Sequence, residues 1–388
     1  MAESLNLLPA SYADFRRQAE NRLPRFLFDY IDGGAVAEDT LRRNTADWES
    51  LQLTQKVLND ASKMDCSVDL FGQKLALPVV LAPVGMGGMT ARRGEVQAKR
   101  AADAAGIPFC LSTVGICPIE EVAGVSDQPM WFQLYMLKDR GIVAEILQRA
   151  WDHGVRTLAF TIDLPVLGTR YRDIRNGMSG GLGPWGKLRS GLIDYALHPR
   201  WAIDVGLRGK PHGFGTIARY VSQSKNPRDY LHWTGSQFDA SVTWKDIEWL
   251  RGVWKGNLVL KGVLDVADAK QTVAIGADGM IISNHGGRQL DGASSTAAML
   301  PRIADALGGS STLIVDGGIR TGQDLVRALA LGANAAMIGR PWVLAIAAGG
   351  EAALTRYLGL LKQDMRTALG LTGAINAKDV GRGVLLEQ

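Results

Sequence analysis

The chain has 388 residues, of which 46% are apolar, and a formal net charge of only +4. This length suits a single large α/β domain, and so small a charge excludes nucleic acid as the main partner. No apolar run reaches the roughly 18 residues of a spanning helix, residues 1–6 do not resemble a secretory signal, and the three cysteines favour a reducing compartment without forming a metal motif.

Residues 11–30 predict a helix, because apolar side chains recur there at helical spacing after the N-cap candidate Ser11. Pro24 interrupts this helix, and Gly33 and Gly34 end it. We expect the segment to form a lid in front of the rest of the domain, with Tyr30 near the open end.

From residue 77 onward, short apolar runs alternate with helix-like segments that end near glycines. The predicted strands are Val79–Ala82, Ile107–Leu111, Met130–Leu134, Thr157–Ile162, Leu258–Leu260, Met280–Ile282, Thr312–Val315 and Ala335–Ile338. The predicted helices between them include Glu95–Ala105, Ile142–His153, Val266–Ile275, Ala297–Ala306 and Gln323–Leu331. Eight such repeats predict a TIM (β/α)8 barrel. The alternative is an open doubly wound sheet, which the lack of Gly-x-Gly-x-x-Gly after the first strand disfavours.

One long insertion, at about residues 168–239, breaks the repeat after the fourth strand. Between residues 168 and 231 it carries 11 basic and 4 acidic side chains, a net +7 that includes Lys225 and Arg228. It also contains Trp185, Trp201 and Trp233. So long a connection predicts a mobile lid, an oligomer contact or a surface that rests on anionic lipid.

Polar or glycine residues follow each of the eight apolar runs. In chain order they are Gly85 (after Val84), Ser112, Gln133 with Tyr135, Thr161 with Asp163, Lys261, Ser283 with His285, Asp316 to Arg320, and Gly339 with Arg340. Because the chemistry of such barrels sits at the C-terminal ends of the strands, this recurrence predicts an active site there.

The stretch Ser283–Gly292 places His285 and Arg288 just past the sixth strand, on a backbone loosened by two glycines. Histidine takes up a proton near neutral pH, and arginine holds a carboxylate with two parallel hydrogen bonds. A base beside an anion clamp predicts a small acidic substrate that loses a proton.

The last two strand ends predict a phosphate site, because Asp316, Gly317, Gly318 and Arg320 stand beside Gly339 and Arg340. Lys261 adds a buried cation, and three neutral groups suit a flat heteroaromatic ring: Ser112, Gln133 and Thr161. A phosphate tail, a polar planar ring and a cation together indicate flavin mononucleotide, FMN.

On these residues, and above all on Ser283–Gly292, the chain resembles the FMN-dependent L-2-hydroxy-acid oxidising family. The resemblance implies that His285 is the catalytic base, paired with Asp163, that Lys261 lies beside the flavin ring, and that Arg170 and Arg288 hold the substrate carboxylate. It implies substrate contacts from Tyr30 and Tyr135. It also implies cofactor contacts from Val84, Gly85, Ser112, Gln133, Thr161, Lys261, Ser283, Asp316, Gly317, Gly318, Arg320, Gly339 and Arg340.

Within the family, Met130–Tyr135, Arg170–Asp173 and Trp201–Gly206 are most similar to bacterial respiratory L-lactate dehydrogenases. This implies oxidation of L-lactate to pyruvate by hydride transfer to FMN, a quinone or other respiratory acceptor, and a homotetramer in the cytoplasm or on the cytoplasmic face of the inner membrane. Glycine at position 85, where family oxidases often carry alanine, favours a poor reaction with oxygen.

Other functions remain open at this point. A related enzyme would oxidise another 2-hydroxy acid, such as mandelate, or would use oxygen. A barrel isomerase or lyase would use FMN passively or not at all. A non-catalytic barrel is disfavoured, because charged side chains at strand ends are costly without a ligand.

Overall fold

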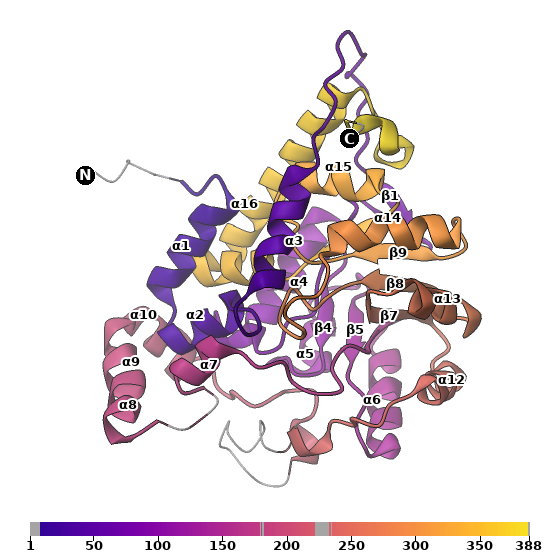
Figure 1. The fold of residues 1–388 in the computed structure, drawn as a ribbon. Coiled ribbons are helices and arrows are strands. Elements are labelled where there is room, and N and C mark those ends of the chain that lie inside the picture. Colours follow the sequence, from indigo (N-terminus) through magenta and orange to yellow (C-terminus); the bar gives the residue numbers. More distant parts are fainter. Residues whose placement is uncertain (1–7, 179, 181, 222–232, 234, 387–388) are drawn as a thin grey trace.

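The computed structural model describes residues 8–178, 180, 182–221, 233 and 235–386. Residues 1–6, Lys225 and Arg228, on which part of the sequence argument rests, lie outside these ranges. The architecture is the predicted (β/α)8 barrel, in which a ring of parallel strands is surrounded by helices (Figure 1).

The barrel strands are parallel and follow the chain order around the ring. They are β3 (Val79–Leu81), β4 (Cys110–Ser112), β5 (Trp131–Leu134), β6 (Thr157–Thr161), β7 (Asn257–Val263), β8 (Gly279–Ile282), β9 (Thr312–Val315) and β10 (Ala335–Ile338). β10 pairs with β3, and a bridge between Leu81 and Phe109 joins β3 to the residues before β4, so the ring is nearly closed. All eight strands are almost wholly buried, as expected for parallel strands covered by helices.

The predicted second strand is confirmed but begins three residues too early, since β4 begins at Cys110 and not at Ile107. Pro108 has no N–H to donate to a neighbouring strand, so the residues before Cys110 make only isolated contacts with β3 and β5. The other seven predicted strands and the five predicted helices agree with the structure to within about three residues at each end.

The helices that cover the barrel bury one face each against the strands. They are α4 (Gly94–Ala105), α5 (Ile119–Ala123), α6 (Arg140–Asp152), α12 (Trp244–Val253), α13 (Val266–Ala274), α14 (Thr296–Leu307), α15 (Gly322–Ala330) and α16 (Arg340–Thr372). Among the described residues α16 alone is long and apolar enough to cross a membrane. Gly349 and Gly350 interrupt its helical backbone, and many of its side chains are buried against the barrel, so it is a core helix of the fold.

Two further parts close the two ends of the barrel. α1 (Tyr12–Arg22) and α2 (Arg25–Asp32) form the expected lid, which Pro24 divides, and α3 (Asp39–Ser50) follows them. The antiparallel hairpin of β1 (Val68–Leu70) and β2 (Gln73–Leu75) lies at the opposite end, where Phe71 contacts Trp131 at the start of β5 and approaches Gly279 at the start of β8.

The insertion after β6 folds into the short helices α7 (Tyr171–Arg175), α8 (Pro184–Leu188), η2 (Arg189–Ile193), α9 (Asp194–Leu197), α10 (Pro199–Trp201), η3 (Ala202–Leu207) and η4 (Ala218–Tyr220). Of these, α7 to α10 gather at one corner of the molecule beside α1 and α2 (Figure 1). Three further short 3₁₀ helices complete the fold. They are η1 (Gly87–Met89), which follows β3, and η5 (Ala377–Asp379) and η6 (Arg382–Val384), which follow α16.

Candidate active site

A cavity of about 390 Å³ lies at the C-terminal ends of the barrel strands. Its wall combines residues from the ends of β3, β6, β7, β9 and β10 with Tyr30 of the lid and with side chains of the insertion. Thus the end of the barrel that the sequence indicated is the end that holds the cavity.

His285 and Asp163 form a hydrogen-bonded pair at this cavity, with 2.9 Å between histidine Nδ1 and carboxylate Oδ1. Burial opposes ionisation of Asp163, but the charge and hydrogen bond of His285 outweigh it, so the pKa of Asp163 is lowered. Since Nδ1 faces the carboxylate of Asp163 and donates to it, Nε2 is the ring nitrogen that can accept a proton from a ligand. The pair has the arrangement of a general base with an orienting carboxylate.

Two backbone features place this pair. His285 has φ +57°, a left-handed conformation that is strained for a side chain of this kind and that occurs most often at functional sites. Gly262, at an irregularity in the pairing of β7 with β8, has φ +111°, and a Cβ there would stand 2.6 Å from Cβ of Asp163. Gly262 therefore admits the carboxylate; sequence reasoning missed this residue, although a glycine inside a strand pattern was a signal for it.

Lys261 is buried at the end of β7 and bonds to two partners, Asp316 Oδ2 at 2.7 Å and Ser283 Oγ at 2.9 Å. Burial acts to lower the pKa of Lys261, but the carboxylates of Asp316 and Asp163 raise it above its usual value. The floor of the cavity thus keeps a positive charge under ordinary conditions.

On neighbouring strands, Ser112 pairs in register with Gln133, and Thr161 pairs with Lys261. Gln133 accepts from Ser112 Oγ at 2.9 Å and donates to Thr161 Oγ1 at 3.0 Å. Of the three, only Thr161 lines the cavity itself. Ser112 and Gln133 lie behind it, so the structure places them as a hydrogen-bonded row that ends at the cavity wall.

Arg170, Arg288, Tyr30 and Tyr135 come together at the mouth. The guanidinium carbons of Arg288 and Arg170 lie 4.9 Å and 5.8 Å from the centre of the Tyr30 ring. Burial and the neighbouring charge of Arg170 lower the pKa of Arg288 to about 9. Nε of Arg170 is buried without a hydrogen-bond partner among the described residues. Two crowded guanidiniums with a donor to spare form a site for an anion.

Arg340 lines the cavity, and its guanidinium also donates to backbone carbonyls, contacts that the sequence did not indicate. Nε donates to Ile31 and Asp32, Nη1 to Gly286 at 2.8 Å, and Nη2 to Gly33 at 2.7 Å. Each terminal nitrogen keeps one further N–H. Arg340 therefore fastens the end of the lid helix to the loop of His285 while it lines the cavity.

Arg288 joins the same contact, since Nη1 donates to the carbonyls of Tyr30 at 2.5 Å and Gly33 at 2.9 Å. The last carbonyls of a helix have no partner within it, and two guanidiniums supply the donors that α2 needs. The end of α2 is thus fixed by Arg288, which is predicted to bind the substrate, and by Arg340, which is predicted to bind the cofactor.

The residues around Asp316 fit the tail of FMN. Asp316 Oδ1 is buried in the cavity wall without a hydrogen-bond partner among the described residues, so it suits a ligand hydroxyl. Gly317 and Gly318 have φ +83° and +95°, and a Cβ at Gly318 would lie 2.1 Å from the carbonyl oxygen of Asn44. Bare backbone amides, Arg320 and Arg340 around one cavity have the chemistry of a phosphate site.

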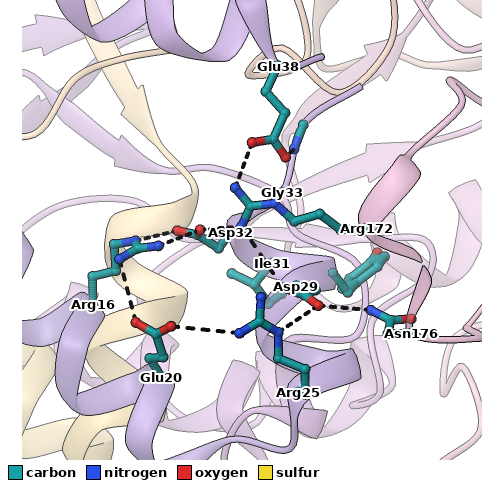
Figure 2. Close-up of polar contacts among 12 residues, drawn as sticks. Arg16, Glu20, Arg25, Asp29, Ile31, Asp32, Gly33, Glu38, Arg172 and Asn176 are labelled. Atoms are coloured by element: carbon teal, nitrogen blue, oxygen red, sulfur yellow. Dashed lines mark hydrogen bonds and ion pairs between the residues drawn. The ribbon is translucent and has the colours of Figure 1, made fainter. Parts of the chain in front are cut away.

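A network of ion pairs joins the lid to the insertion (Figure 2). Asp32 accepts from Arg16 Nε at 2.7 Å and from Arg172 Nη1 at 2.8 Å, and Arg172 reaches Glu38 at 2.6 Å. Arg25 continues the network to Asp29, at 2.9 Å. Burial opposes ionisation of Asp32, but Arg16 and then Arg172 lower its pKa. Sequence reasoning missed this network, because its members are up to about 150 residues apart in the chain.

The helix α3 and the loop of His285 are held together by a buried amide pair. Asn44 and Asn284 exchange two hydrogen bonds of 2.8 Å each, and Trp48 Nε1 donates to the carbonyl of Gly317 at 2.8 Å. Gln289 donates to the carbonyl of Asp163 at 2.8 Å. The sequence analysis predicted none of these contacts, although Asn284 and Gln289 belong to the stretch Ser283–Gly292.

Comparison with known proteins places this geometry in context. The family model described as FMN-dependent dehydrogenase matches residues 19–387. The L-lactate dehydrogenase of Alcaligenes faecalis is 52% identical over 98% of this chain and all of its own length, and that of Stenotrophomonas maltophilia is 54% identical over 98% of this chain and 99% of its own.

Solved structures of similar proteins have the same fold. The monotopic membrane protein (S)-mandelate dehydrogenase, 34% identical, superposes with a TM-score of 0.91 over 98% of this chain and 100% of its own. A mandelate oxidase, also 34% identical, gives a TM-score of 0.82 over 98% of this chain and 99% of its own.

Proposed function

Because the chain belongs to the FMN-dependent dehydrogenase family and is an enzyme that oxidises 2-hydroxy acids, we propose that its substrate is L-lactate and its product pyruvate. The observation that carries the proposal is one cavity with the His285–Asp163 pair and two buried arginines on its wall. A base and an anion clamp are the two groups that a small 2-hydroxy acid requires.

Substrate binding rests on Arg170 and Arg288. The substrate carboxylate lies between their guanidiniums and takes the spare donor of Arg170. Its negative charge offsets the repulsion and burial that lower the pKa of Arg288. Tyr30 and Tyr135 line the same region and add hydroxyl groups. Fixing the carboxylate at several points orients the α-carbon for reaction.

The proton of the substrate hydroxyl goes to Nε2 of His285. Asp163 accepts from Nδ1, keeps the ring in the required tautomer and stabilises the imidazolium that results. Bound FMN supplies the acceptor for the two electrons of the α-carbon–hydrogen bond, which leave as hydride. Lys261, buried and held by Asp316, provides a fixed positive charge that stabilises negative charge gained in this cavity.

The apolar part of the cavity wall is consistent with a small substrate side chain. Met86, Val114 and Leu167 line the cavity. Phe214 and Phe238 from the insertion stand with them. The second candidate is mandelate, which the structural similarity to a mandelate dehydrogenase favours.

Anaerobic reduction of the bound flavin by a series of L-2-hydroxy acids separates these candidates. L-Lactate should reduce it with a higher rate constant divided by dissociation constant than glycolate or L-mandelate, and D-lactate should leave it oxidised. A preference for mandelate would replace lactate as the substrate without affecting the rest of the mechanism. Reduction by none of them would contradict the proposed function.

The electron acceptor is proposed to be a membrane quinone, reached from a peripheral position on the cytoplasmic face of the membrane. Twelve of the twenty large apolar side chains that are exposed among the described residues lie between positions 166 and 207, including Trp185 and Leu192. Exposed apolar side chains together with basic ones in one segment suit an interfacial position. Gly85 supports an acceptor other than oxygen; faster turnover with oxygen than with a soluble quinone would count against it.

A further inference from the structure

A second cavity, of about 540 Å³, lies between the lid helix α2 and the insertion. It is separate from the active-site cavity in its lining. The residues around it are Arg25, Phe26, Asp29, Arg172, Arg175, Asn176, Leu182, Gly186, Arg189, Ile193, Asp194 and Leu197. The proposed reaction uses none of them.

The charge around this cavity is unbalanced. Arg25 is held by Asp29 at 2.9 Å, and Arg172 is held by Asp32 and Glu38 (Figure 2). Arg175 and Arg189 have no carboxylate partner within the described part of the chain, and the guanidinium carbon of Arg175 lies 5.8 Å from the centre of the Tyr171 ring. Two guanidiniums at a concave site are therefore available to an anion.

One carboxylate oxygen of the cavity lacks a hydrogen bond, although its residue is ion-paired with Arg25 at 2.9 Å and with Arg172 at 4.0 Å. Asp29 is 5% exposed, and its Oδ1 has no hydrogen-bond partner within the part of the chain that the structure describes. A buried carboxylate oxygen in this condition favours a ligand that brings a hydroxyl donor as well as a negative charge.

The remaining wall is apolar and continues to the surface. Phe26, Leu182 and Ile193 line the cavity, and Leu197, also in its lining, is 71% exposed. Leu188 and Leu192 are exposed on the same short helices. A ligand for this site would therefore be anionic at one end and apolar at the other.

We propose that this cavity binds the headgroup of an anionic glycerophospholipid, with the phosphate at Arg175 and Arg189 and the acyl chains toward the exposed leucines. The proposal rests on the membrane association proposed above and names its lipid partner. The shared chemistry of a phosphate group also admits free phosphate as an occupant, so the experiment must separate the two.

The experiment measures binding of the FMN-loaded full-length protein to vesicles by sedimentation. One set of vesicles contains phosphatidylcholine only, and the other also contains phosphatidylglycerol. The double variant Arg175→Gln/Arg189→Gln is compared with Arg208→Gln/Lys210→Gln, which removes the same charge from exposed positions of the insertion outside the cavity. Retained flavin absorbance and soluble lactate oxidation show that each variant is folded.

At about 1 M salt the Debye length falls to about 3 Å, so general attraction to a charged surface is screened. The wild type and the control variant should still prefer phosphatidylglycerol by about tenfold, as expected for one charge-assisted hydrogen bond. The Arg175→Gln/Arg189→Gln variant should bind both kinds of vesicle equally. Inorganic phosphate added to the mixture should not remove the preference of the wild type.

Four results would overturn the headgroup site. Equal loss of preference in the two double variants, or a wild type without preference at high salt, would leave only surface charge as the attraction. Loss of the preference on addition of inorganic phosphate would identify a free-anion site. Failure of the wild type to bind any vesicle would contradict the membrane association as well, while soluble lactate oxidation would still test the enzymatic proposal separately.

Discussion

The two ends of the barrel are built from the same eight strands but differ in almost every physical respect. At the N-terminal end, the hairpin β1–β2 closes the barrel with Leu70, Leu75 and Phe71 against apolar neighbours. At the C-terminal end, charged groups such as Lys261 and Asp316 are buried around a cavity. The N-terminal end stabilises the fold. At the C-terminal end charged side chains are buried at a cost in free energy, which a bound ligand would reduce.

The loops of the cavity and the hairpin also differ in their backbone. Left-handed φ values occur at His285, Gly286 and Gly287, and again at Gly317 and Gly318, all beyond strand C-termini. The hairpin has them only at its turn, Phe71 and Gly72, where a two-residue connection requires them. Substitutions at the two ends should therefore separate chemistry from stability.

The largest effect is expected for His285→Gln, which keeps a side chain of similar size but removes the base. Flavin reduction by L-lactate should slow by about 10³- to 10⁴-fold, toward the upper range for general base catalysis, while FMN stays bound. Stopped-flow absorbance measures both. Reduction at a rate close to that of the wild type would remove His285 from the proposed mechanism.

Arg170→Met should have the next largest effect. Loss of one guanidinium from a buried anion site is expected to lower kcat/KM for L-lactate by about 10²- to 10³-fold, the range of a broken buried charge pair. Arg175→Met, at the last residue of the short helix that Arg170 precedes and outside the active-site cavity, is the matched control and should change kcat/KM little. Equal effects of the two substitutions would show that Arg170 does not hold the substrate.

Leu75→Ala tests the opposite end of the barrel. Leu75 is fully buried in the hairpin, so its truncation should lower the free energy of unfolding by about 3 kcal/mol. Chemical denaturation measures this change, and kcat/KM at low temperature should stay within about twofold of the wild type. A large loss of kcat/KM in folded protein would show that the two ends are not independent.

Asp32→Asn tests the network that joins the lid to the insertion, and it should cost about 2 kcal/mol of stability at neutral pH. The pKa of Asp32 is lowered in the fold by Arg16 and Arg172. Its contribution is thus complete above the ordinary value of 3.8 and is lost as the pH falls below 3.8 through the folded-state value. The stability difference between wild type and variant should shrink over that acidic range; a constant difference would contradict the assignment.

The barrel was largely predictable from the sequence because its strands are buried on both faces and so appear as short continuous apolar runs. The same pattern located the strand ends, where His285, Lys261 and Asp316 meet. Pro24 likewise marked the break between α1 and α2. Each of these signals is local, because it lies within one short segment of the chain.

What could not be predicted depends on contacts between distant segments. The donors of Arg340 go to carbonyls about 310 residues earlier in the chain, and a basic side chain after a strand gives no sign of that choice. The amide pair of Asn44 with Asn284 is of the same kind. Gly262 is intermediate, since a glycine in a strand suggests an irregularity but does not say that Asp163 will approach it.

The central claim is that residues from these strand ends surround one flavin that a 2-hydroxy acid reduces. Anaerobic titration of the FMN-loaded protein with L-lactate tests it most directly, with pyruvate measured in parallel. We expect one flavin per chain, complete bleaching by one equivalent of L-lactate, and one equivalent of pyruvate. A flavin that stays oxidised in excess L-lactate and every other L-2-hydroxy acid would contradict the account.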